Sequence, residues 1–231
     1  NHQSPVPEGV QNVLYEPTRQ PSAATHRYLH GAERAVLQGQ EVWRVCRELK
    51  QQGFTPDVIC VHPGWGDGLF LKDIYPSSPV LSYLEFYYRF YNADVNFDPE
   101  TPSDIDDSAR VRIKNTTNLH NLEMTDWGIA PTHWQKSVHP EEFHHKISVI
   151  HEGIDTQLVA PVAEINIPTT KGRVLKKGDP IVTYVTRNFE HYRGSHQFFR
   201  AVKQIQEMHP EAFVIAVGAD PPVAKLGSAP T

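Results

Sequence analysis

Two side chains that could do chemistry together follow two neighbouring apolar runs of the sequence. His62 comes directly after the run 57–61, and Glu85 lies near the end of the run 80–86. Runs rich in Val, Ile and Leu form buried parallel strands, whose carboxyl ends share one edge of a sheet and bind ligands there. A carboxylate at that edge can orient an imidazole or accept a hydrogen bond from a sugar hydroxyl. We therefore predict that His62 and Glu85 face one cleft as the catalytic pair; the alternative is a histidine satisfied within the core.

A glycine-rich turn separates the two runs. Its three glycines are spaced by single residues, at Gly64, Gly66 and Gly68. This spacing is close to the dinucleotide fingerprint G-x-G-x-x-G, and Glu85 lies at the distance expected for the acid that binds the ribose. Leu69 occupies the place of the third glycine, however, and the bulky Trp65 lies where the backbone would approach a pyrophosphate. A nicotinamide dehydrogenase is therefore a weaker hypothesis than a turn that needs the backbone freedom of glycine.

A second candidate site lies in the segment TRNFEHYRG, at residues 186–194. Arg187 ends a predicted strand, and Arg193 and Gly194 open a predicted helix. Two guanidinium groups near a helix N-terminus can hold a diphosphate, because their N–H donors and the helix dipole both favour anionic oxygens. We predict that Arg187, Arg193 and Gly194 bind the diphosphate of a ligand. A pair of solvated arginines is the alternative.

Two further patterns could bind a metal ion but have simpler explanations. The motif Asp104-Ile105-Asp106 is a D-x-D, which can bind a metal–nucleotide complex, but it opens a predicted helix, where Asp is a favourable cap. Four histidines lack the spacing of a zinc site and are expected on the surface: His139, His144, His145 and His151. We therefore predict no metal site.

Alternating strands and helices position these candidate residues. Strands are predicted at 10–15, 57–61, 80–86, 127–130, 146–151, 181–186 and 213–217. Helices are predicted from apolar residues at helical spacing, at 32–50, 68–74, 104–123 and 195–208. Strands that alternate with helices form parallel sheets, so the predicted fold class is α/β.

The composition divides the chain into three parts. Residues 1–155 hold most of the strands and helices, residues 156–179 contain Pro, Lys and Gly with little periodicity, and residues 180–231 begin a new α/β unit. We predict two Rossmann-like domains joined by a linker or hairpin. The second block has two strands and one helix, too few for an independent sheet, and the first block lacks the glycine-rich opening strand. We therefore expect that both ends of a longer protein are missing, so that the N-terminal domain is mostly present and the C-terminal domain truncated.

Bulk properties narrow the function classes. The formal charge of −5 over 231 residues, without a basic stripe, argues against nucleic acid as a partner. Cys46 and Cys60 are too few for a disulfide framework and lie in elements whose composition indicates burial, which fits a reducing compartment. The sequence shows no apolar run long enough to span a bilayer and no secretory signal. We expect a cytoplasmic protein.

Six segments of the chain, taken in order, are similar to a known family: HPGWGDGLFLKDIYP, LSYLEFYYR, DVNFDPE, APTHWQKSVHP, ISVIHEGID and VTRNFEHYRG. They resemble a bacterial subgroup of the glycosyltransferase family 4 enzymes, and the resemblance runs from about Tyr28 to Asp220. It implies a GT-B fold, in which two Rossmann-like domains face each other across a cleft. It also implies transfer of a sugar from a nucleotide diphosphate sugar to an acceptor hydroxyl, with retention of anomeric configuration and without a metal or another cofactor.

The resemblance assigns expected roles to particular residues. In the wider family an Arg and a Lys-Gly pair hold the donor diphosphate; Arg187, Arg193 and Gly194 fall on those positions, with Arg in place of the usual Lys. Many members carry a His where this chain has Glu85, so no family role is carried over to that residue. The acceptor-side loop falls on five residues: Pro63, Gly64, Trp65, Gly66 and Asp67.

The resemblance also implies partners and leaves alternatives open. Two hallmarks of the family are expected outside these residues: the glycine-rich loop of the first domain would precede residue 1, and the paired-glutamate motif that grips the donor sugar and nucleoside would follow residue 231. We therefore expect little or no activity from this chain by itself. The expected partners are a nucleotide-sugar donor and a saccharide or lipid-linked acceptor, and a lipid acceptor would bring the protein to the inner face of a membrane. The oligomeric state stays open. Besides the dehydrogenase, the alternatives are a GT-B sugar-nucleotide epimerase and a non-catalytic binding domain.

Overall fold

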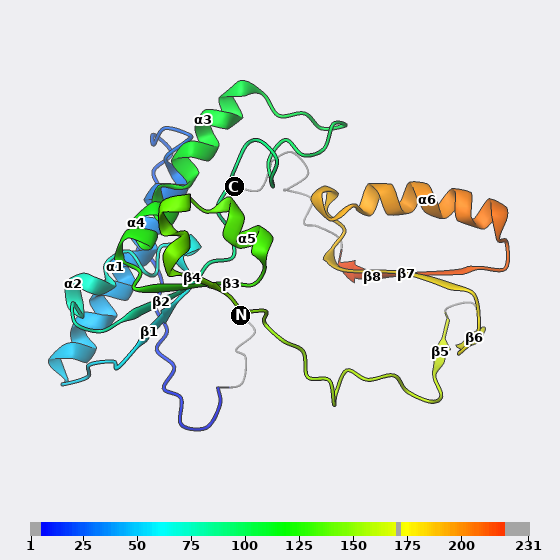
Figure 1. Cartoon of the computed structure of the whole chain (residues 1–231), viewed down its shortest axis with the longest axis horizontal. Helices are drawn as coiled ribbons and strands as arrows, with labels where there is room; N and C mark the ends of the chain where they lie inside the picture. The colour runs from blue at the N-terminus through cyan, green and yellow to red at the C-terminus, as the bar shows by residue number, and fades with distance from the viewer. Residues whose placement is uncertain (1–5, 170–171, 220–231) are drawn as a thin grey trace. The chain divides into compact units, whose positions relative to one another are not determined.

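The computed structural model of the chain describes residues 6–169 and 172–219. The chain divides into two compact units between Gly153 and Ile154. Each unit contains strands and helices (Figure 1), so the fold is mixed α/β, as predicted. The last part of the predicted third segment, residues 220–231, lies outside the described residues.

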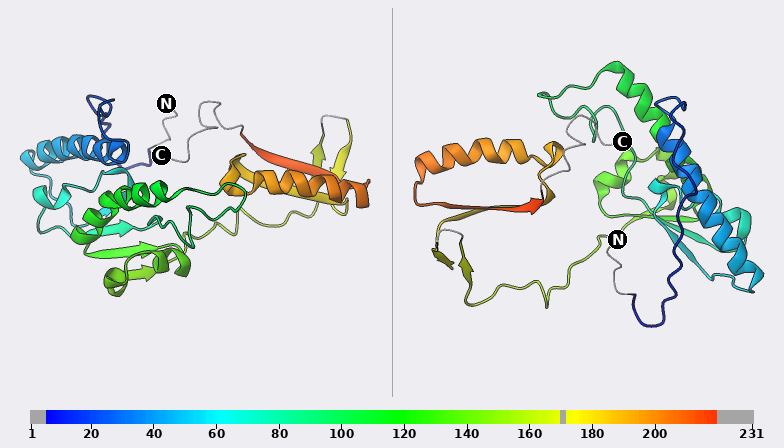
Figure 2. Two further views of the ribbon diagram at one scale, coloured as in Figure 1. Left: turned by 90° about the horizontal axis from the view of Figure 1, so that it is seen from above. Right: turned by 180° about the vertical axis from the view of Figure 1, so that it is seen from behind.

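The first unit is built on a four-stranded parallel sheet. Its strands lie in the spatial order β1 (Ile59–Val61), β2 (Val80–Tyr83), β3 (Trp127–Ala130) and β4 (Ile147–Val149). The register pairs Cys60 with Leu81, and Tyr83 with Ile129. Each strand pairs with the next one along the chain, and connections between parallel strands are right-handed. The connecting helices therefore lie on one face of the sheet, as Figures 1 and 2 show for α4; α1, which precedes β1, packs on the same face.

The helices of the first unit are α1 (His30–Gln51), α2 (Leu71–Ile74), α3 (Ile105–Lys114), α4 (Thr116–Met124) and α5 (His133–Val138), with the 3-10 helices η1 (Pro63–Trp65) and η2 (Glu141–Lys146). After α1 the chain reverses at Gly53, whose φ of +90° favours glycine and whose N–H donates to the carbonyl of Lys50 at 3.0 Å. Asp104 and Thr132 accept backbone N–H hydrogen bonds as N-caps of α3 and α5. The D-x-D motif thus begins with a helix cap.

Two clusters of buried side chains join the helices to one face of the sheet. The first contains Leu84, Leu122, Ala130 and Ile147, with Tyr87 and Phe143 packed against it. The second contains Val61, Leu71 and Val80, with Val42, Cys46, Ile59 and Met124 packed against it. Full burial of a side chain of this size contributes about 1.5–3 kcal/mol, so these clusters hold the first unit together. We call this the inner face; alternate residues of each strand point to the opposite, outer face.

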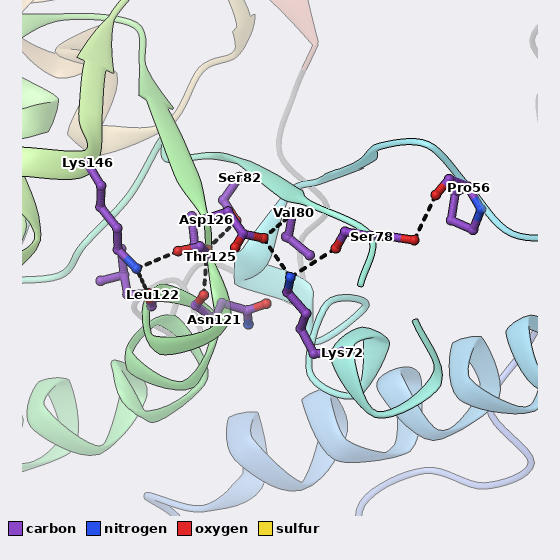
Figure 3. Close-up of polar contacts among 10 residues, drawn as sticks. All are labelled: Pro56, Lys72, Ser78, Val80, Ser82, Asn121, Leu122, Thr125, Asp126 and Lys146. Atoms are coloured by element: carbon purple, nitrogen blue, oxygen red, sulfur yellow. Dashed lines mark hydrogen bonds and ion pairs between the residues drawn. The ribbon is translucent and has the colours of Figure 1, made fainter. Parts of the chain in front are cut away.

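A polar network joins the amino ends of the strands (Figure 3). The Lys72 ammonium lies 2.7 Å from a carboxylate oxygen of Asp126, which also accepts the Val80 N–H at 2.7 Å. Lys72 donates to the carbonyl of Ser78 at 2.9 Å, and the Ser78 hydroxyl donates to the carbonyl of Pro56 at 2.7 Å. A single carboxylate therefore fixes the starts of β2 and β3 relative to each other.

The same network reaches the last strand through Lys146 (Figure 3). Its ammonium donates to the carbonyls of Leu122 at 2.6 Å and Thr125 at 2.5 Å, at the C-terminal end of α4, where cations are favoured. The hydroxyl of Thr125 lies 2.6 Å from that of the fully buried Ser82 in β2. Polar groups at this edge are thus used to hold the sheet, which leaves the opposite, carboxyl edge for a ligand.

Several local expectations from the sequence are wrong. His139, expected on the surface, is buried, with its Nδ1 atom 2.7 Å from the carbonyl oxygen of Gln135. Residues 10–15 form no strand, because no neighbouring strand offers them a hydrogen-bond ladder; instead, the Tyr15 hydroxyl donates to Asp67 at 3.0 Å. Cys60 is exposed rather than buried, because it points to the outer face of β1, away from the helices.

The predicted helix 104–123 is interrupted at Asn115, between α3 and α4. The hydroxyl of Thr116 donates to the carbonyl of Ile113 at 2.6 Å, a bond that competes with regular helix geometry. The buried side chain of Asn115 turns to the segment after β2, where it bonds both the N–H and the carbonyl of Tyr88, at 3.0 and 2.7 Å. The other predicted helices and strands are present, with shifted ends.

The second unit contains two small sheets. β5 (Asn166–Pro168) and β6 (Val174–Lys176) pair antiparallel within the predicted linker or hairpin. β7 (Ile181–Asn188) and β8 (Phe213–Ala219) pair in parallel, and η3 (His191–Arg193) and α6 (Ser195–Met208) connect them. α6 runs alongside this pair (Figure 1), where the ring of Tyr184 stacks on that of Phe198 with centroids 4.7 Å apart. In the described parts of both units, no helix has the length and apolar character needed to cross a bilayer.

Candidate functional site

The structure brings His62 and Glu85 together at the carboxyl ends of β1 and β2. The Nε2 atom of His62 lies 3.1 Å from a carboxylate oxygen of Glu85, within hydrogen-bond distance. Strand alternation explains the pairing, because side chains two positions apart point to the same face. The residues on the outer face are Cys60 and His62 in one run and Leu81, Tyr83 and Glu85 in the next. The two side chains are 34% and 39% exposed, so a ligand in solution can reach both.

The other ring nitrogen of His62, Nδ1, is buried and has no hydrogen-bond partner among the described residues. A proton on Nδ1 would therefore be a buried donor without an acceptor, which is unfavourable. The arrangement that satisfies the ring best is a neutral imidazole whose Nε2–H donates to the Glu85 carboxylate. His62 thus orients Glu85, and Glu85 keeps acceptor capacity for a hydroxyl group.

Tyr83 and Glu152 form a second polar pair beside the first. The Tyr83 hydroxyl donates a short hydrogen bond to a carboxylate oxygen of Glu152, which follows β4. Burial, and then the Glu152 hydrogen bond, raise the pKa of Tyr83 to about 12. The Tyr83 ring lies 5.9 Å from the His62 ring, centroid to centroid. Sequence reasoning missed both residues. Glu152 could have been found, because it follows β4, which ends at the same edge of the sheet as β1 and β2.

A hollow of about 360 Å³ lies on the outer face next to these two pairs. Its lining is mostly apolar and comes from three neighbouring strands: Cys60, Val61, His62, Leu81, Tyr83 and Ile129. His62 and Tyr83 belong to both the hollow and the polar pairs. The sheet edge therefore combines hydrogen-bonding groups with an adjoining apolar surface, as small-molecule sites commonly do.

Close packing explains why the turn after His62 needs glycine. A Cβ atom on Gly66, whose φ is +100°, would lie 2.2 Å from the carbonyl oxygen of Ala35 in α1. A Cβ atom on Gly68 would lie 2.1 Å from the side-chain oxygen of Asn121 in α4. Gly64 differs, since its Cβ would meet only the His62 ring at 3.5 Å. The glycine pattern is therefore explained by contact with two helices, which favours the turn over a dinucleotide-binding loop.

The remaining residues of the predicted acceptor-side loop are fixed or exposed in different ways. The carbonyl of Pro63 accepts a hydrogen bond from the buried Asn121 amide at 3.2 Å, and Asp67 accepts one from Tyr15. Trp65 projects from the turn with 69% of its surface exposed. A rigid turn thus presents one large aromatic ring to solvent a few residues beyond His62.

The predicted diphosphate residues lie in the second unit. Arg193 ends η3, and its guanidinium lies 3.0 Å from a carboxylate oxygen of Glu190. Gly194 has a φ of +77° and is the N-cap of α6. Arg187 is exposed in β7, and none of the described interactions joins it to Arg193. The sequence did not indicate that Glu190 pairs with the Arg193 guanidinium. The hydrogen bond from Tyr192, followed by that from Arg193, lowers the pKa of the Glu190 carboxyl.

A half-buried cluster of charged and aromatic groups supports the segment that carries Glu85. The ammonium of Lys114 lies 3.7 Å from the centre of the Tyr88 ring, a cation–π contact. Burial lowers the pKa of Lys114 to about 8 and raises the pKa of the neighbouring Asp94 carboxyl. Lys114 comes from α3, whereas Tyr88 and Asp94 lie in the loop after β2, and no sequence pattern links them, so sequence reasoning could not find the cluster.

The His62–Glu85 pair and the hollow lie toward the carboxyl edge of a parallel sheet, which is where α/β proteins usually bind their ligands. The chain belongs to the glycosyl transferase family 4 group, whose family model matches residues 1–159. The match includes the first unit and therefore the His62–Glu85 pair, the Tyr83–Glu152 pair and the hollow beside them. A comparison with curated proteins found no match. The resemblance to glycosyltransferase family 4 is thus confirmed over residues 1–159, and a glycosyltransferase uses a sugar donor and an acceptor.

Proposed function

We propose that this protein transfers a sugar from a nucleotide diphosphate sugar to an acceptor hydroxyl with retention of configuration, in the synthesis of a polysaccharide or glycoconjugate. The observation that carries the proposal is the 3.1 Å contact between His62 and Glu85 at the carboxyl edge of the sheet. Both residues lie within the stretch matched by the glycosyl transferase family model. The proposal therefore rests on a defined pair of groups as well as on the family.

Glu85 is the residue that touches the acceptor in this proposal. An ionised carboxylate accepts hydrogen bonds and has two oxygens, of which one is engaged by His62. The second oxygen can hold the attacking hydroxyl in the orientation needed for transfer. His62 is a positioning residue, because its Nδ1 atom is buried and its Nε2 atom is turned to Glu85.

The donor is held by the second unit in this proposal. Arg187, Arg193 and the N–H groups at the start of α6 bind the diphosphate, where anionic oxygens are favoured. The acceptor oxygen forms a bond to the anomeric carbon, the bond from that carbon to the diphosphate breaks, and its electron pair leaves with the nucleoside diphosphate. The hydroxyl proton passes to the departing diphosphate oxygen on the same face. The arginines stabilise the charge that develops on this leaving group.

An activity assay on the full-length protein tests the proposal. Panels of nucleotide sugars and saccharide acceptors are incubated with the protein, and new glycosides are detected by mass spectrometry and their anomeric configuration by NMR. We expect Glu85→Gln to lower turnover by about 100-fold or more, since it removes the oriented negative charge. Glu48→Gln, at an exposed position on α1, is the matched control and should change turnover little. Full turnover in Glu85→Gln, or release of free or epimerised sugar without a new glycoside, would contradict the proposal.

A further inference from the structure

The outer face of the sheet changes from polar to apolar along the strands. At the carboxyl edge it carries His62, Tyr83 and Glu85, and toward the amino edge it carries Cys60, Leu81 and Trp127. Trp127 is 47% exposed and donates its indole N–H to the Ser148 hydroxyl at 3.0 Å, which holds the ring over this face. A ligand that lies along the strands from Glu85 therefore meets a hydroxyl-binding end first and an apolar surface next.

The outer face of this parallel sheet is open in the part of the chain that the structure describes. Such sheets normally have both faces covered, because their strands are apolar on both sides. Here the buried clusters lie on the inner face, while Cys60 and Trp127 on the outer face are exposed. Apolar surface left open to water costs free energy, which an apolar ligand in the hollow would recover.

The charges around the hollow restrict what can fill it. None of its six lining residues carries a permanent charge, and the two ionisable groups bonded to its rim, Glu85 and Glu152, are acidic. A phosphate or carboxylate placed here would be repelled by two carboxylates. The volume of about 360 Å³ lies within the range of roughly 300–1,000 Å³ usual for small-molecule sites.

We propose that the hollow binds the apolar part of the acceptor, so that the acceptor is an uncharged amphiphile of the alkyl or aryl glycoside class. Its sugar hydroxyl is held by Glu85, and its alkyl or aryl group lies on Cys60, Leu81 and Ile129. The hollow is continuous with the candidate site, because His62 and Tyr83 belong to both. This inference rests on the proposed function, since it assumes that the ligand at Glu85 is an acceptor.

Cys60 is a reporter for occupancy of the hollow. It is exposed and lines the hollow, whereas Cys46 is half-buried in the core between α1 and the sheet and has a pKa raised by burial. The protein is alkylated with a maleimide, and the labelled peptides are separated and quantified by mass spectrometry. Octyl glucoside below its micelle concentration, methyl glucoside and octyl phosphate are the probes.

We expect octyl glucoside to slow alkylation of Cys60 by about tenfold when its concentration is roughly ten times the Kd. Methyl glucoside lacks the apolar group and octyl phosphate is repelled, so both should leave the rate unchanged, as should every probe at Cys46. Leu81→Ser should abolish the protection; Val36→Ser, at an exposed position of α1, should not. Far-UV circular dichroism verifies that each variant is folded.

Other occupants of the hollow would give different results. Protection of Cys60 that rises with protein concentration in the absence of a probe would indicate a second copy of the chain and would overturn the inference. Equal protection by octyl phosphate would overturn the predicted charge selectivity. Transfer to methyl glycosides without protection by octyl glucoside would leave the proposed function standing and reject this inference. Protection without transfer from any donor would instead reject the proposed function.

Discussion

A Cβ atom placed on Gly66 would lie 2.2 Å from the carbonyl oxygen of Ala35, so the turn after His62 rests directly on the backbone of α1. The contact is reciprocal, since a Cβ atom on Gly39 of α1 would lie 2.5 Å from the carbonyl oxygen of Gly66. Ala35 and Gly39, which are one helical turn apart on α1, are small enough to let the loop after His62 approach the helix. The position of His62 at the sheet edge depends on this close approach.

Gly66→Ala should destabilise the protein by about 2–5 kcal/mol, because the new methyl group meets backbone and the φ of +100° is strained for alanine. Gly64→Ala is the matched control, since its methyl group would make only an ordinary contact; its change should stay within about 0.5 kcal/mol. Urea unfolding of both variants measures the difference. Equal stability of the two variants would show that the turn does not need Gly66.

Asp126→Asn should weaken folding near neutral pH by on the order of 1 kcal/mol, a value reduced because half of the side chain is exposed. The hydrogen bond from Lys72, followed by that from the Val80 N–H, lowers the pKa of Asp126 below its usual value. A carboxyl whose folded-state pKa is depressed stabilises above its unfolded pKa, and this contribution is lost as pH falls through the folded pKa.

The difference between wild type and Asp126→Asn should therefore be present at pH 7 and shrink at pH 3, measured by urea unfolding at both values. Asp57→Asn, at an exposed position before β1, is the matched control and should show little difference at either pH. A difference for Asp126→Asn that is as large at pH 3 as at pH 7 would mean that its charge does not contribute.

Asn115→Ala should cost roughly 2–4 kcal/mol, because it leaves both the N–H and the carbonyl of Tyr88 without their partner in a half-buried segment. Asn115→Asp separates the two bonds, since the carboxylate still accepts from the Tyr88 N–H but cannot donate to its carbonyl. We expect an intermediate loss of stability for this variant. Thermal unfolding ranks the two variants, and an Asp variant less stable than the Ala variant would contradict this account.

Arg187→Ala combined with Arg193→Ala should weaken binding of a nucleoside diphosphate to the full-length protein by about 10- to 100-fold, as expected for lost charged hydrogen bonds worth roughly 1.5–3 kcal/mol. Calorimetry measures the affinity. Lys203→Ala removes one positive charge from the exposed surface of α6 and should have a small, salt-dependent effect. Unchanged affinity in the double variant would remove these arginines from the donor site.

Glu190→Gln tests the same diphosphate site by removing the carboxylate that pairs with Arg193. Glu190 holds the Arg193 guanidinium at 3.0 Å, so a diphosphate must compete with this carboxylate. Removing its charge should strengthen diphosphate binding, and the gain should vanish when Arg193 is also replaced by alanine. A gain that persists without Arg193 would show that Glu190 acts through another group.

The amino-acid sequence by itself determined the order of strands and helices in the first unit and the placement of His62 and Glu85 at neighbouring strand ends. Both follow from local rules: apolar runs form parallel strands, and consecutive parallel strands end at one edge. The family resemblance also comes from the sequence, because its six segments are recognised without a structure. Local rules failed at residues 10–15, where a predicted strand has no strand to pair with among the described residues.

Only the tertiary structure decided which surfaces meet and which stay open. The need for Gly66 and Gly68 comes from helices that lie far away in sequence, and the Tyr83–Glu152 pair joins residues from two different strand ends. The same is true of Cys60, whose strand composition indicates burial although the outer face of β1 is open. Burial and close contact depend on every element packed against a residue, and a residue's own neighbours along the chain do not contain that information.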